Sequence, residues 1–238
     1  MINFAHRGAS GDFPENTLLA FLEGIKAGAT GIELDVHKSK DNQLVVIHDE
    51  DVERTLRGKG LVQDFTLEEL QALKTRKLLF QTVDNCNVPT LEKVFKLIKQ
   101  HSVILNIELK TDEIHYVGIE EDVISLIHQY GLVDQILISS FNPESIRICK
   151  ELDERIKTGL LYDEPIENVI EFAKVLKADA IHPNLRWVSE DLIKEAHANG
   201  ILVNVYTVNS PSYMRKLIQA GVDGIFTDYP ALLDEILK

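Results

Sequence analysis

Three acidic residues lie in runs of sequence that are otherwise apolar. Glu33 and Asp35 alternate with apolar residues in one short run, and Glu108 does so in another. If the two runs are strands of a closed barrel, their outward positions pack on helices and the charged positions point into the lumen near the strand ends. Buried carboxylates must be protonated, paired with cations or bound to a metal ion. Because these side chains offer oxygen and no thiolate, the sequence predicts a site for a hard divalent ion, Ca²⁺ or Mg²⁺.

Two basic residues flank the acidic ones. Arg7 follows the first apolar run of the chain, and Lys110 lies two positions after Glu108. Ion pairing with these cations, or with Lys38, is the alternative to metal binding, but three carboxylates exceed what one or two cations would neutralise. Arg7 and Lys110 are also suited to holding the oxygens of a phosphate, arginine by a bidentate fork and lysine as a point charge.

Two histidines are predicted to lie beside the acidic residues. His6 ends the first apolar run, and His48 ends a later one. Histidine is the side chain best able to give and take protons near neutral pH, so the pair is a candidate general acid and base, whereas either one alone could be a satisfied core residue. Tyr206 either lines the mouth of the barrel or packs in the core. His182 is a weaker candidate for substrate contact, and His37 is expected to lie past the acidic pair without a role.

The elements that must position these residues follow a regular order. Short β-branched runs alternate with longer segments in which apolar residues recur every three or four positions, a pattern typical of βα units around a parallel sheet. Eight such units favour an α/β fold of the closed TIM-type (β/α)8 barrel over an open doubly wound sheet. The predicted strands are Ile2 to His6, Gly31 to His37, Val103 to Lys110, Gln135 to Phe141, Lys157 to Tyr162, Ala180 to Asn184, Ile201 to Val208 and Gly224 to Asp228. Capping residues predict helix starts at Pro143, Pro165, Glu190 and Pro211.

Two features interrupt this alternation. The run from Leu44 to His48 reads as an extra strand, joined to the preceding strand by a hairpin turn that places Asp35 opposite His48. The segment from about Asp49 to Val88 is far longer than a usual βα loop and contains one short amphipathic helix, Thr66 to Leu73. We expect this insert to form a small cap subdomain over the site.

Composition narrows the class of protein. The chain has 238 residues, of which 45% are hydrophobic and 26% charged, in agreement with a single barrel domain over residues 1–238. Its formal charge of −13 repels a phosphate backbone, so nucleic acid is not an expected partner. No apolar run is long enough for a membrane span, and the first residues lack the features of a secretory signal, so a cytoplasmic location is expected. Cys86 and Cys149 are expected to be free thiols because their spacing suits neither a metal site nor a disulfide framework.

The residues singled out above belong to a series of motifs that runs through nearly the whole chain. The motifs are His6-Arg7-Gly8, Pro14-Glu15-Asn16-Thr17, Glu33-Leu34-Asp35-Val36, His48-Asp49, Arg54-Thr55, Gly58-Lys59-Gly60, Pro89-Thr90-Leu91, Glu108-Leu109-Lys110, Ser140-Phe141 and the run from Gly221 to Pro230. In this order they resemble the glycerophosphodiester phosphodiesterase family, of the bacterial cytoplasmic type. One short motif alone is weak evidence, whereas this many in order is highly specific. The sequence departs from the family at Tyr206-Thr207-Val208-Asn209, where the family often has tryptophan.

The resemblance implies a fold and a reaction. It implies a TIM-type barrel that uses one divalent cation to hydrolyse glycerophosphodiesters to glycerol 3-phosphate and an alcohol, with the glycerol C2 hydroxyl attacking first and water opening the cyclic phosphate that results. The long segment after His48 matches the family's inserted subdomain. By motif position, the implied metal ligands are Glu33, Asp35 and Glu108, the implied acid and base are His6 and His48, and the implied phosphate contacts are Arg7 and Lys110.

Two other functions are compatible with the same residues. A phosphodiesterase of the same chemistry, acting as a lysophospholipase D, would work at a membrane surface. The net charge argues against adsorption to anionic lipid, but the insert has apolar residues that could receive an acyl chain: Leu56, Leu61, Phe65, Leu78, Leu79 and Phe80. The second is a non-catalytic metal-binding barrel, against which the two histidines argue. A sugar-phosphate isomerase or aldolase is less compatible, because no lysine is placed away from the acids as an obvious Schiff-base candidate. The oligomeric state, the alcohol and the choice between Ca²⁺ and Mg²⁺ stay open.

Overall fold

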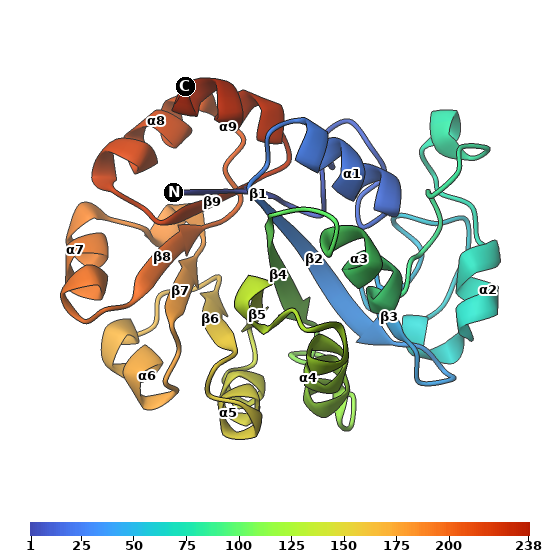
Figure 1. The fold of residues 1–238 in the computed structure, drawn as a ribbon, viewed down its shortest axis with the longest axis horizontal. Helices are drawn as coiled ribbons and strands as arrows, with labels where there is room; N and C mark the ends of the chain where they lie inside the picture. The colour runs from blue at the N-terminus through green and yellow to red at the C-terminus, as the bar shows by residue number, and fades with distance from the viewer.

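In the computed structural model, which describes residues 1–238, eight parallel strands close into a barrel (Figure 1). The sheet runs in the order β1-β9-β8-β7-β6-β5-β4-β2, and pairing between β1 and β2 closes it. The TIM-type barrel is therefore confirmed, and every predicted strand is present. The largest difference is at Tyr206 to Val208, which lie beyond the end of β8. The barrel strands are β1 (Ile2–Ala5), β2 (Gly31–Lys38), β4 (Ile104–Leu109), β5 (Ile136–Ser140), β6 (Lys157–Tyr162), β7 (Ala180–Pro183), β8 (Leu202–Val205) and β9 (Gly224–Thr227).

A helix lies between each barrel strand and the next, and one more follows the last strand. These helices cover the outside of the barrel (Figure 1). The covering helices are α1 (Leu18–Lys26), α3 (Leu91–Ile98), α4 (Ile119–Tyr130), α5 (Pro143–Leu152), α6 (Val169–Val175), α7 (Glu190–Ala198), α8 (Pro211–Ala220) and α9 (Pro230–Leu237). Asn142 and Ser189 cap α5 and α7 through their side-chain oxygens, as predicted. The predicted helix start at Pro165 is wrong. Asn168 has a left-handed backbone with φ of 54°, which a helix interior does not allow, so α6 begins only after it.

The extra strand β3 (Leu44–Val46) pairs antiparallel with the end of β2. Its predicted register is wrong by one residue. The backbone N–H of Ser39 donates to the carbonyl of Gln43, so Ser39 faces Gln43 across a turn one residue shorter than predicted and does not face the first residue of β3. The N–H of Ile47 consequently donates to the carbonyl of Asp35 over 3.1 Å, and Asp35 lies opposite Ile47 instead of His48. A shift of one residue in a strand exchanges its two faces.

The insert that follows β3 has a small core of its own. Its helix α2 (Leu67–Ala72) begins with a capping box in which Thr66 and Glu69 bond each other's backbone N–H groups. Two short 3-10 turns, η1 (Val62–Asp64) and η2 (Leu78–Phe80), flank this helix. The buried apolar residues that join the insert to β3 are Val45, Ile47, Val52, Leu56, Val62, Leu70 and Val88. None of the helices in the chain has the length and apolar character that crossing a membrane requires.

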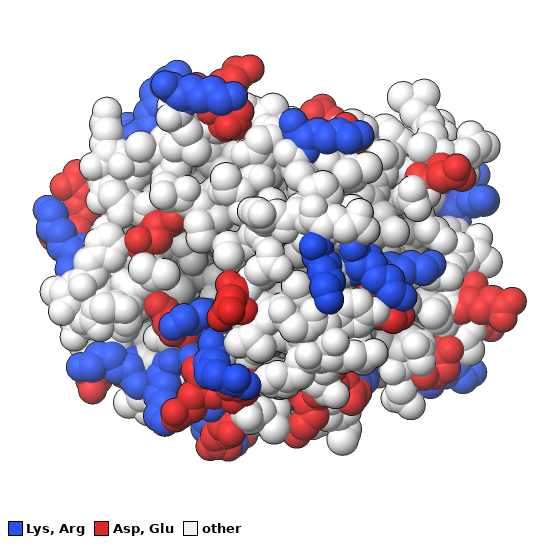
Figure 2. All heavy atoms as spheres, viewed as in Figure 1, with Lys and Arg blue, Asp and Glu red and all other residues white.

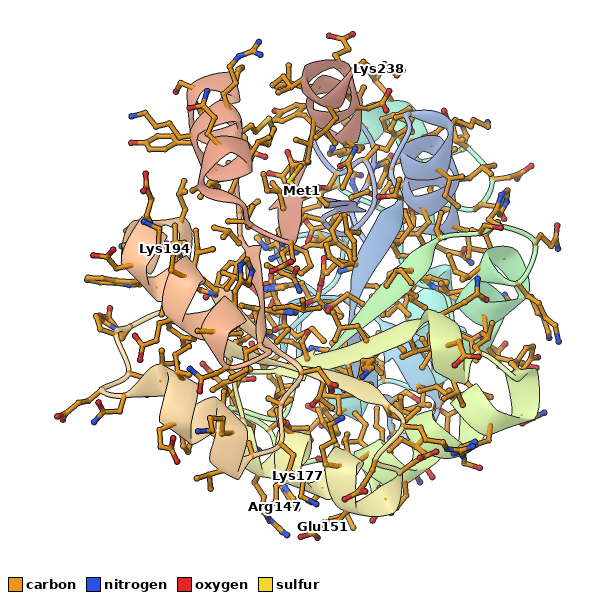
Figure 3. The ribbon with its side chains drawn as sticks, turned by 60° about the vertical axis from the view of Figure 1, so that its left-hand side comes forward. Met1, Arg147, Glu151, Lys177, Lys194 and Lys238 are labelled. Carbon is orange, nitrogen blue, oxygen red and sulfur yellow. The ribbon has the colours of Figure 1, made fainter.

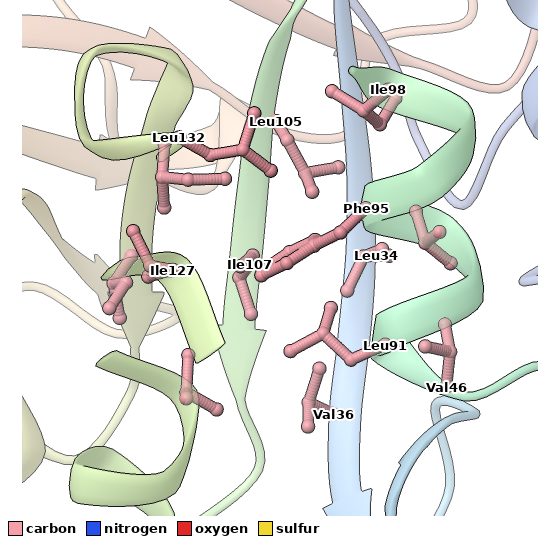
Figure 4. Close-up of a cluster of buried hydrophobic side chains, with 14 of the residues drawn as sticks. Leu34, Val36, Val46, Leu91, Phe95, Ile98, Leu105, Ile107, Ile127 and Leu132 are labelled. Atoms are coloured by element: carbon pink, nitrogen blue, oxygen red, sulfur yellow. The ribbon is translucent and has the colours of Figure 1, made fainter. Parts of the chain in front are cut away.

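The main core lies between the barrel and its helices. Figure 4 shows Leu34 and Ile107, from β2 and β4, against Phe95 of α3. Within the lumen, Phe4 and Phe226 stack at a centroid separation of 4.5 Å and fill the barrel below the strand ends. Charged side chains such as Arg147 and Lys194 point outward from the helices (Figure 3). Most charged side chains lie in solvent, and the buried ones outside the lumen are few, namely Lys38, Glu120 and Lys150.

Candidate active site

The three acidic residues converge at the carboxyl ends of neighbouring strands. Asp35 on β2 is the register partner of Glu108 on β4, and Glu33 lies one pleat earlier on β2. A carboxylate oxygen from each lies within 4.8 Å of the others. Their exposed fractions are 3% for Glu33, 0% for Asp35 and 9% for Glu108. The period-2 alternation of two adjacent strands therefore produces a cluster at the barrel end where TIM-type enzymes place their sites.

The negative charges of these three carboxylates are not fully balanced by the positive side chains beside them. Burial, together with repulsion from the other two carboxylates, raises the pKa of Glu33 well above its ordinary value. Burial and the charge of Asp35 also raise the pKa of Glu108. The pKa of Asp35 is lowered, because nearby positive groups and a hydrogen bond from Asn16 outweigh its burial. One oxygen of Asp35, Oδ1, is buried without any hydrogen-bond partner. An oxygen-only donor set with an unpartnered buried carboxylate oxygen fits a hard divalent cation.

Arg7 approaches this cluster from the loop after β1. Its backbone is left-handed, with φ of 56°, and its N–H donates to Glu33 Oε2 over 2.7 Å. Its Nη1 donates to Glu15 Oε1 over 3.0 Å, and its Nε lies 3.6 Å from Asp35 Oδ2. Gly8, the next residue, has φ of +83°, and a Cβ there would lie 2.5 Å from the backbone of Ala20. Only glycine permits this approach of the loop to α1, which explains the His-Arg-Gly order.

Lys110 lies just past the end of β4. Its Nζ donates to Glu108 Oε1 over 3.1 Å, and its side chain is almost fully buried. Burial opposes the charged form, but Glu108 and Asp35 outweigh it and raise the pKa of Lys110. The lysine ammonium also lies 5.9 Å from the ring centroid of Phe141. Lys110 is therefore a fixed, permanently charged group at the edge of the acidic cluster.

His6 is held by an acid from the last strand. Its Nδ1 lies 2.7 Å from Asp228 Oδ1, so a neutral imidazole carries its proton on Nδ1 and leaves Nε2 free. Ser10 Oγ and Asn209 Nδ2 also donate to Asp228, over 3.0 and 2.6 Å. Asp228 is partly buried, but these bonds lower its pKa to about 2, so it stays ionised. Burial lowers the pKa of His6 despite the charge of Asp228, and His6 is consequently an unprotonated base at neutral pH.

His48 has the same arrangement with a different acid. Its Nδ1 lies 2.5 Å from Asp49 Oδ1, in the first residue of the insert. Arg54 donates from Nε to Asp49 Oδ2 over 2.6 Å, and from Nη1 to Glu15 Oε2 over 2.7 Å. Hydrogen bonds from His48 and Arg54 outweigh partial burial and lower the pKa of Asp49. Because Glu15 also accepts from Arg7, a continuous chain of charged groups joins the insert to the loop after β1.

His37 contributes to the site although the sequence indicated no role for it. Its Nε2 lies 3.0 Å from the backbone carbonyl of His48, and its Nδ1 lies 2.9 Å from the hydroxyl of Tyr116. A carbonyl only accepts, so Nε2 carries the proton and Nδ1 accepts from the tyrosine. Burial lowers the pKa of His37, which agrees with this neutral form. His37 thereby fixes the backbone that presents His48.

A cavity of ≈ 140 Å³ brings together most of the predicted residues, although Asp35 and Lys110 are not part of its lining. Its lining includes His6, Arg7, Glu33, His48, Glu108, Phe141, Leu161, His182 and Tyr206. Tyr206 therefore lines the mouth, but its hydroxyl donates to the carbonyl of Tyr162 over 2.9 Å and its ring meets Phe141 edge-on. His182 lies on the floor, fully buried, and its Nε2 accepts from Asn204 over 3.0 Å.

A second cavity, of ≈ 180 Å³, lies between the insert and the barrel and shares His48 with the first. Its lining also includes Glu15, Arg54, Thr55 and Arg76. The insert thus reaches the catalytic end of the barrel on the side of His48. Of the apolar insert residues proposed to receive an acyl chain, Leu56 is buried within the insert, whereas Leu78 and Leu79 are exposed.

The sequence reasoning missed the partners of the predicted residues. Asp49, Asp228, Glu15 and Asn16 all lie in motifs that carried the family resemblance, yet no role was assigned to them. For Asp49 a signal exists, since an acid directly follows a candidate catalytic histidine. For Asp228 the only signal is its place directly after the last strand, 222 positions from His6.

Comparison with known proteins agrees with this geometry. Residues 6–232 match the Glycerophosphoryl diester phosphodiesterase family. The chain is 40% identical over 234 residues to the glycerophosphodiester phosphodiesterase of Caldanaerobacter subterraneus subsp. tengcongensis, which covers 98% of this chain and 96% of that protein. A protein of the same name from Bacillus altitudinis is 39% identical over 95% of this chain and 94% of its own length.

Solved structures show the same relationship. A phosphodiesterase of Oleispira antarctica, in complex with the product sn-glycerol-3-phosphate, superposes with a TM-score of 0.86 at 29% identity, over 98% of this chain and 95% of that one. The glycerophosphodiester phosphodiesterase of Thermotoga maritima gives a TM-score of 0.77 at 29% identity, over 99% and 98% of the two chains. The alternative of a non-catalytic metal-binding barrel is therefore wrong: the chain belongs to the glycerophosphoryl diester phosphodiesterase family and is an enzyme of that class.

Proposed function

We propose that the chain hydrolyses glycerophosphodiesters to glycerol 3-phosphate and an alcohol, with a divalent cation and with His6 and His48 as the acid and base. One observation carries the proposal: two histidines, each bonded through Nδ1 to an ionised aspartate, line one cavity with Glu33 and Glu108. The product bound in the Oleispira antarctica phosphodiesterase supports the choice of substrate.

Glu33, Asp35 and Glu108 are the residues that would hold the cation. Burial and repulsion from neighbouring carboxylates raise the pKa values of Glu33 and Glu108, and a cation would relieve this repulsion. When bound, a divalent cation supplies positive charge that stabilises the phosphoryl oxygens and lowers the pKa of a hydroxyl group. The oxygen donors suit both Ca²⁺ and Mg²⁺, which differ in the geometry that they demand.

The chain's own cations act on the phosphate. A phosphodiester carries one negative charge and gains more as attack proceeds, so groups placed beside its oxygens stabilise the transition state more than the ground state. Lys110 is fixed by Glu108, and Arg7 is fixed by its backbone bond to Glu33 and by the bond from its Nη1 to Glu15. Both side chains are therefore held in place before the substrate arrives, and no reorganisation is needed during the reaction.

The two histidines divide the proton transfers. Because Asp228 and Asp49 hold the Nδ1 protons, each neutral ring offers Nε2 to the substrate. One Nε2 accepts the proton of the attacking hydroxyl, while the other ring, in its protonated form, gives a proton to the leaving oxygen. The lowered pKa of His6 favours His6 as the proton acceptor, which leaves the second transfer, to the leaving oxygen, to His48.

The identity of the attacking hydroxyl has a direct test. If the glycerol C2 hydroxyl attacks first, the reaction is intramolecular and gains from the proximity of the two reacting atoms. A substrate analogue without that hydroxyl is then expected to bind but hardly turn over. Rapid hydrolysis of the 2-deoxy analogue would instead show that water attacks directly.

The overall proposal is tested by a panel of glycerophosphodiesters with different head groups, assayed with added Ca²⁺, added Mg²⁺ or a chelator. We expect release of glycerol 3-phosphate that the chelator abolishes and one of the ions restores. Lysophosphatidylcholine in the same panel tests the lysophospholipase D alternative. Turnover of that lipid alone would overturn the choice of substrate, and full activity in the chelator would overturn the role of the metal.

A further inference from the structure

The insert ends in an apolar turn that projects from the molecule. Turn η2 carries Leu78 and Leu79, with exposed fractions of 69% and 88%, and Val83 close by is 42% exposed. In Figure 1 this turquoise turn stands apart at the upper right, beyond α1 and α2. Figure 2 shows uncharged atoms at that corner. Two adjacent leucines at such exposure gain nothing from folding, which points to a partner that covers them.

The same segment is locally basic in an acidic protein. Residues 73–85 contain three cations, Lys74, Arg76 and Lys77, and one acid, Asp84, whereas the whole chain has a charge of −13. None of the three cations is bonded to a carboxylate. Arg76 donates to the backbone carbonyl of Glu53, and Lys77 donates to backbone carbonyls as well. The positive charge of the segment is therefore available to an anionic partner.

The turn is fixed against the mouth of the barrel. Lys77 Nζ donates to the carbonyl of Phe13 over 2.7 Å and to that of Ser10 over 3.1 Å. The ring of Phe80 meets that of Phe13 edge-on, with centroids 5.8 Å apart. Ser10 is also a partner of Asp228, which holds His6. A surface that covers the leucines would consequently lie beside the entrance to the active site.

We propose that residues 74–83 form a docking tip for lipid bilayers that contain anionic lipids. Exposed leucines flanked by lysine and arginine are the composition that inserts at a membrane interface, with the apolar side chains below the head groups and the cations beside them. Asp84 is the one acid among residues 73–85, and salt screens charges farther away than the Debye length of about 8 Å at physiological ionic strength, so distant acids weaken this local attraction less than nearby ones. A second copy docked tip to tip is a poorer occupant, because its tip carries the same excess of positive charge.

Sedimentation with vesicles tests the tip without relying on catalysis. The probes are vesicles of phosphatidylcholine alone and of phosphatidylcholine mixed with phosphatidylglycerol. The variants are Leu78→Ser with Leu79→Ser, and Lys74→Glu. The matched control is Val117→Ser with Val175→Ser, since these two valines are 80% and 72% exposed on other parts of the surface.

We expect the wild-type chain to sediment with the mixed vesicles and hardly with phosphatidylcholine alone. Binding should weaken about tenfold or more in the double leucine variant, several-fold in Lys74→Glu, and not at all in the valine control. Hydrolysis of a water-soluble diester should be unchanged in all variants, which separates this proposal from the proposed reaction. Equal binding by wild type and the leucine variant, or no binding at all, overturns it. Loss of self-association in the leucine variant, measured without vesicles, would show that the tip contacts a second copy.

Discussion

The two halves of the barrel lumen bury polar groups in different states of charge. On the side of β1, β2 and β4, Glu33, Asp35 and Glu108 are buried as acids beside only two cations. On the side of β7 and β8, His182 and Asn204 are buried as neutral groups that bond each other. Burial lowers the pKa of His182 to about 3, so this side has no charge at neutral pH.

The acidic half of the lumen is arranged for chemistry, whereas the neutral half belongs to the structural core. The neutral half makes one internal hydrogen bond and leaves His182 Nδ1 and Asn204 Oδ1 without partners, but these groups carry no charge, and the stacked rings of Phe4 and Phe226 close the lumen beneath them. The acidic half leaves Asp35 Oδ1 unpartnered and raises the pKa of Glu33, both of which an added cation would relieve. A buried charge that the protein does not neutralise is expensive, so its presence indicates a ligand. The comparison predicts that substitutions in the acidic half remove function, whereas those in the neutral half change stability.

The largest effect is expected from the carboxylates. Replacing Glu33 or Glu108 by Gln, or Asp35 by Asn, removes a charged ligand from a set of three, so metal affinity should fall by more than the roughly 10- to 100-fold typical of residues that only support a ligand. Activity should fall with it. Calorimetric titration with Ca²⁺ and Mg²⁺ measures the affinity. Exposed Glu190→Gln is the matched control, and unchanged affinity in all three variants would remove the metal assignment.

Removal of either catalytic histidine should lower turnover and leave the metal bound. For His6→Ala and His48→Ala we expect kcat to fall by about 100- to 10,000-fold, because each ring transfers a proton in the reaction. His101→Ala, on the opposite end of the barrel, serves as the control. Rates measured from about pH 5 to pH 9 should lose one limb of the wild-type profile in each variant. Near-normal turnover across that range would contradict the assignment of the acid and base.

The sequence was sufficient to predict which side chains share one face of a strand, because the periodicity of the strand controls this. Glu33 and Asp35 could be placed on one face, and Glu108 near them, because strands alternate and parallel neighbours end at the same edge. The register of β3 could not be derived in the same way. It depends on whether Ser39 faces Leu44 or Gln43, and the bond from Ser39 to Gln43 shows that the turn is one residue shorter than predicted.

Contacts between segments that are far apart in the chain could not be predicted from the sequence. Asp228 reaches His6 only because β9 pairs with β1, and Glu15 reaches Arg54 only because the insert folds back over the loop after β1. No role is expected for His37 from the sequence because it lies beyond the acidic pair along the same strand. Its importance comes from the backbone carbonyl of His48, and no pattern of side chains reveals a bond to a carbonyl.

A smaller effect, on stability, is expected in the neutral half. The unfolded chain protonates His182 below about pH 6.5, whereas the folded chain does so only near 3. Neutral His182 therefore contributes fully above pH 6.5, and its contribution is lost as the pH falls toward 3, by roughly 1.4 kcal/mol per pH unit. His182→Gln keeps an acceptor for Asn204 but cannot be protonated. Between about pH 6.5 and 4.5 the wild type should lose about 2 kcal/mol more unfolding free energy than this variant, as measured by urea titration. Parallel pH curves for the two proteins would contradict the neutral state of His182.

The smallest effect is expected from the insert, which we propose sets the choice of head group without performing the phosphate chemistry. The structure restricts how this can be tested, because Asp49 and Arg54 belong to the insert and orient His48. A shortened insert must therefore keep these two residues and lose only the part between Gly58 and Leu73. Thr55→Ala, on the wall of the second cavity, is a milder variant that keeps the small core of the insert intact.

Contacts between the insert and a head group contribute about 1 to 3 kcal/mol to discrimination, so the ratio of kcat/KM between two head groups should shift by about tenfold while metal affinity stays the same. Thermal unfolding shows whether each variant is folded. A folded variant with an unchanged ratio across the panel would place substrate choice in the barrel loops alone, and the acidic half of the lumen would then account for both the chemistry and the specificity.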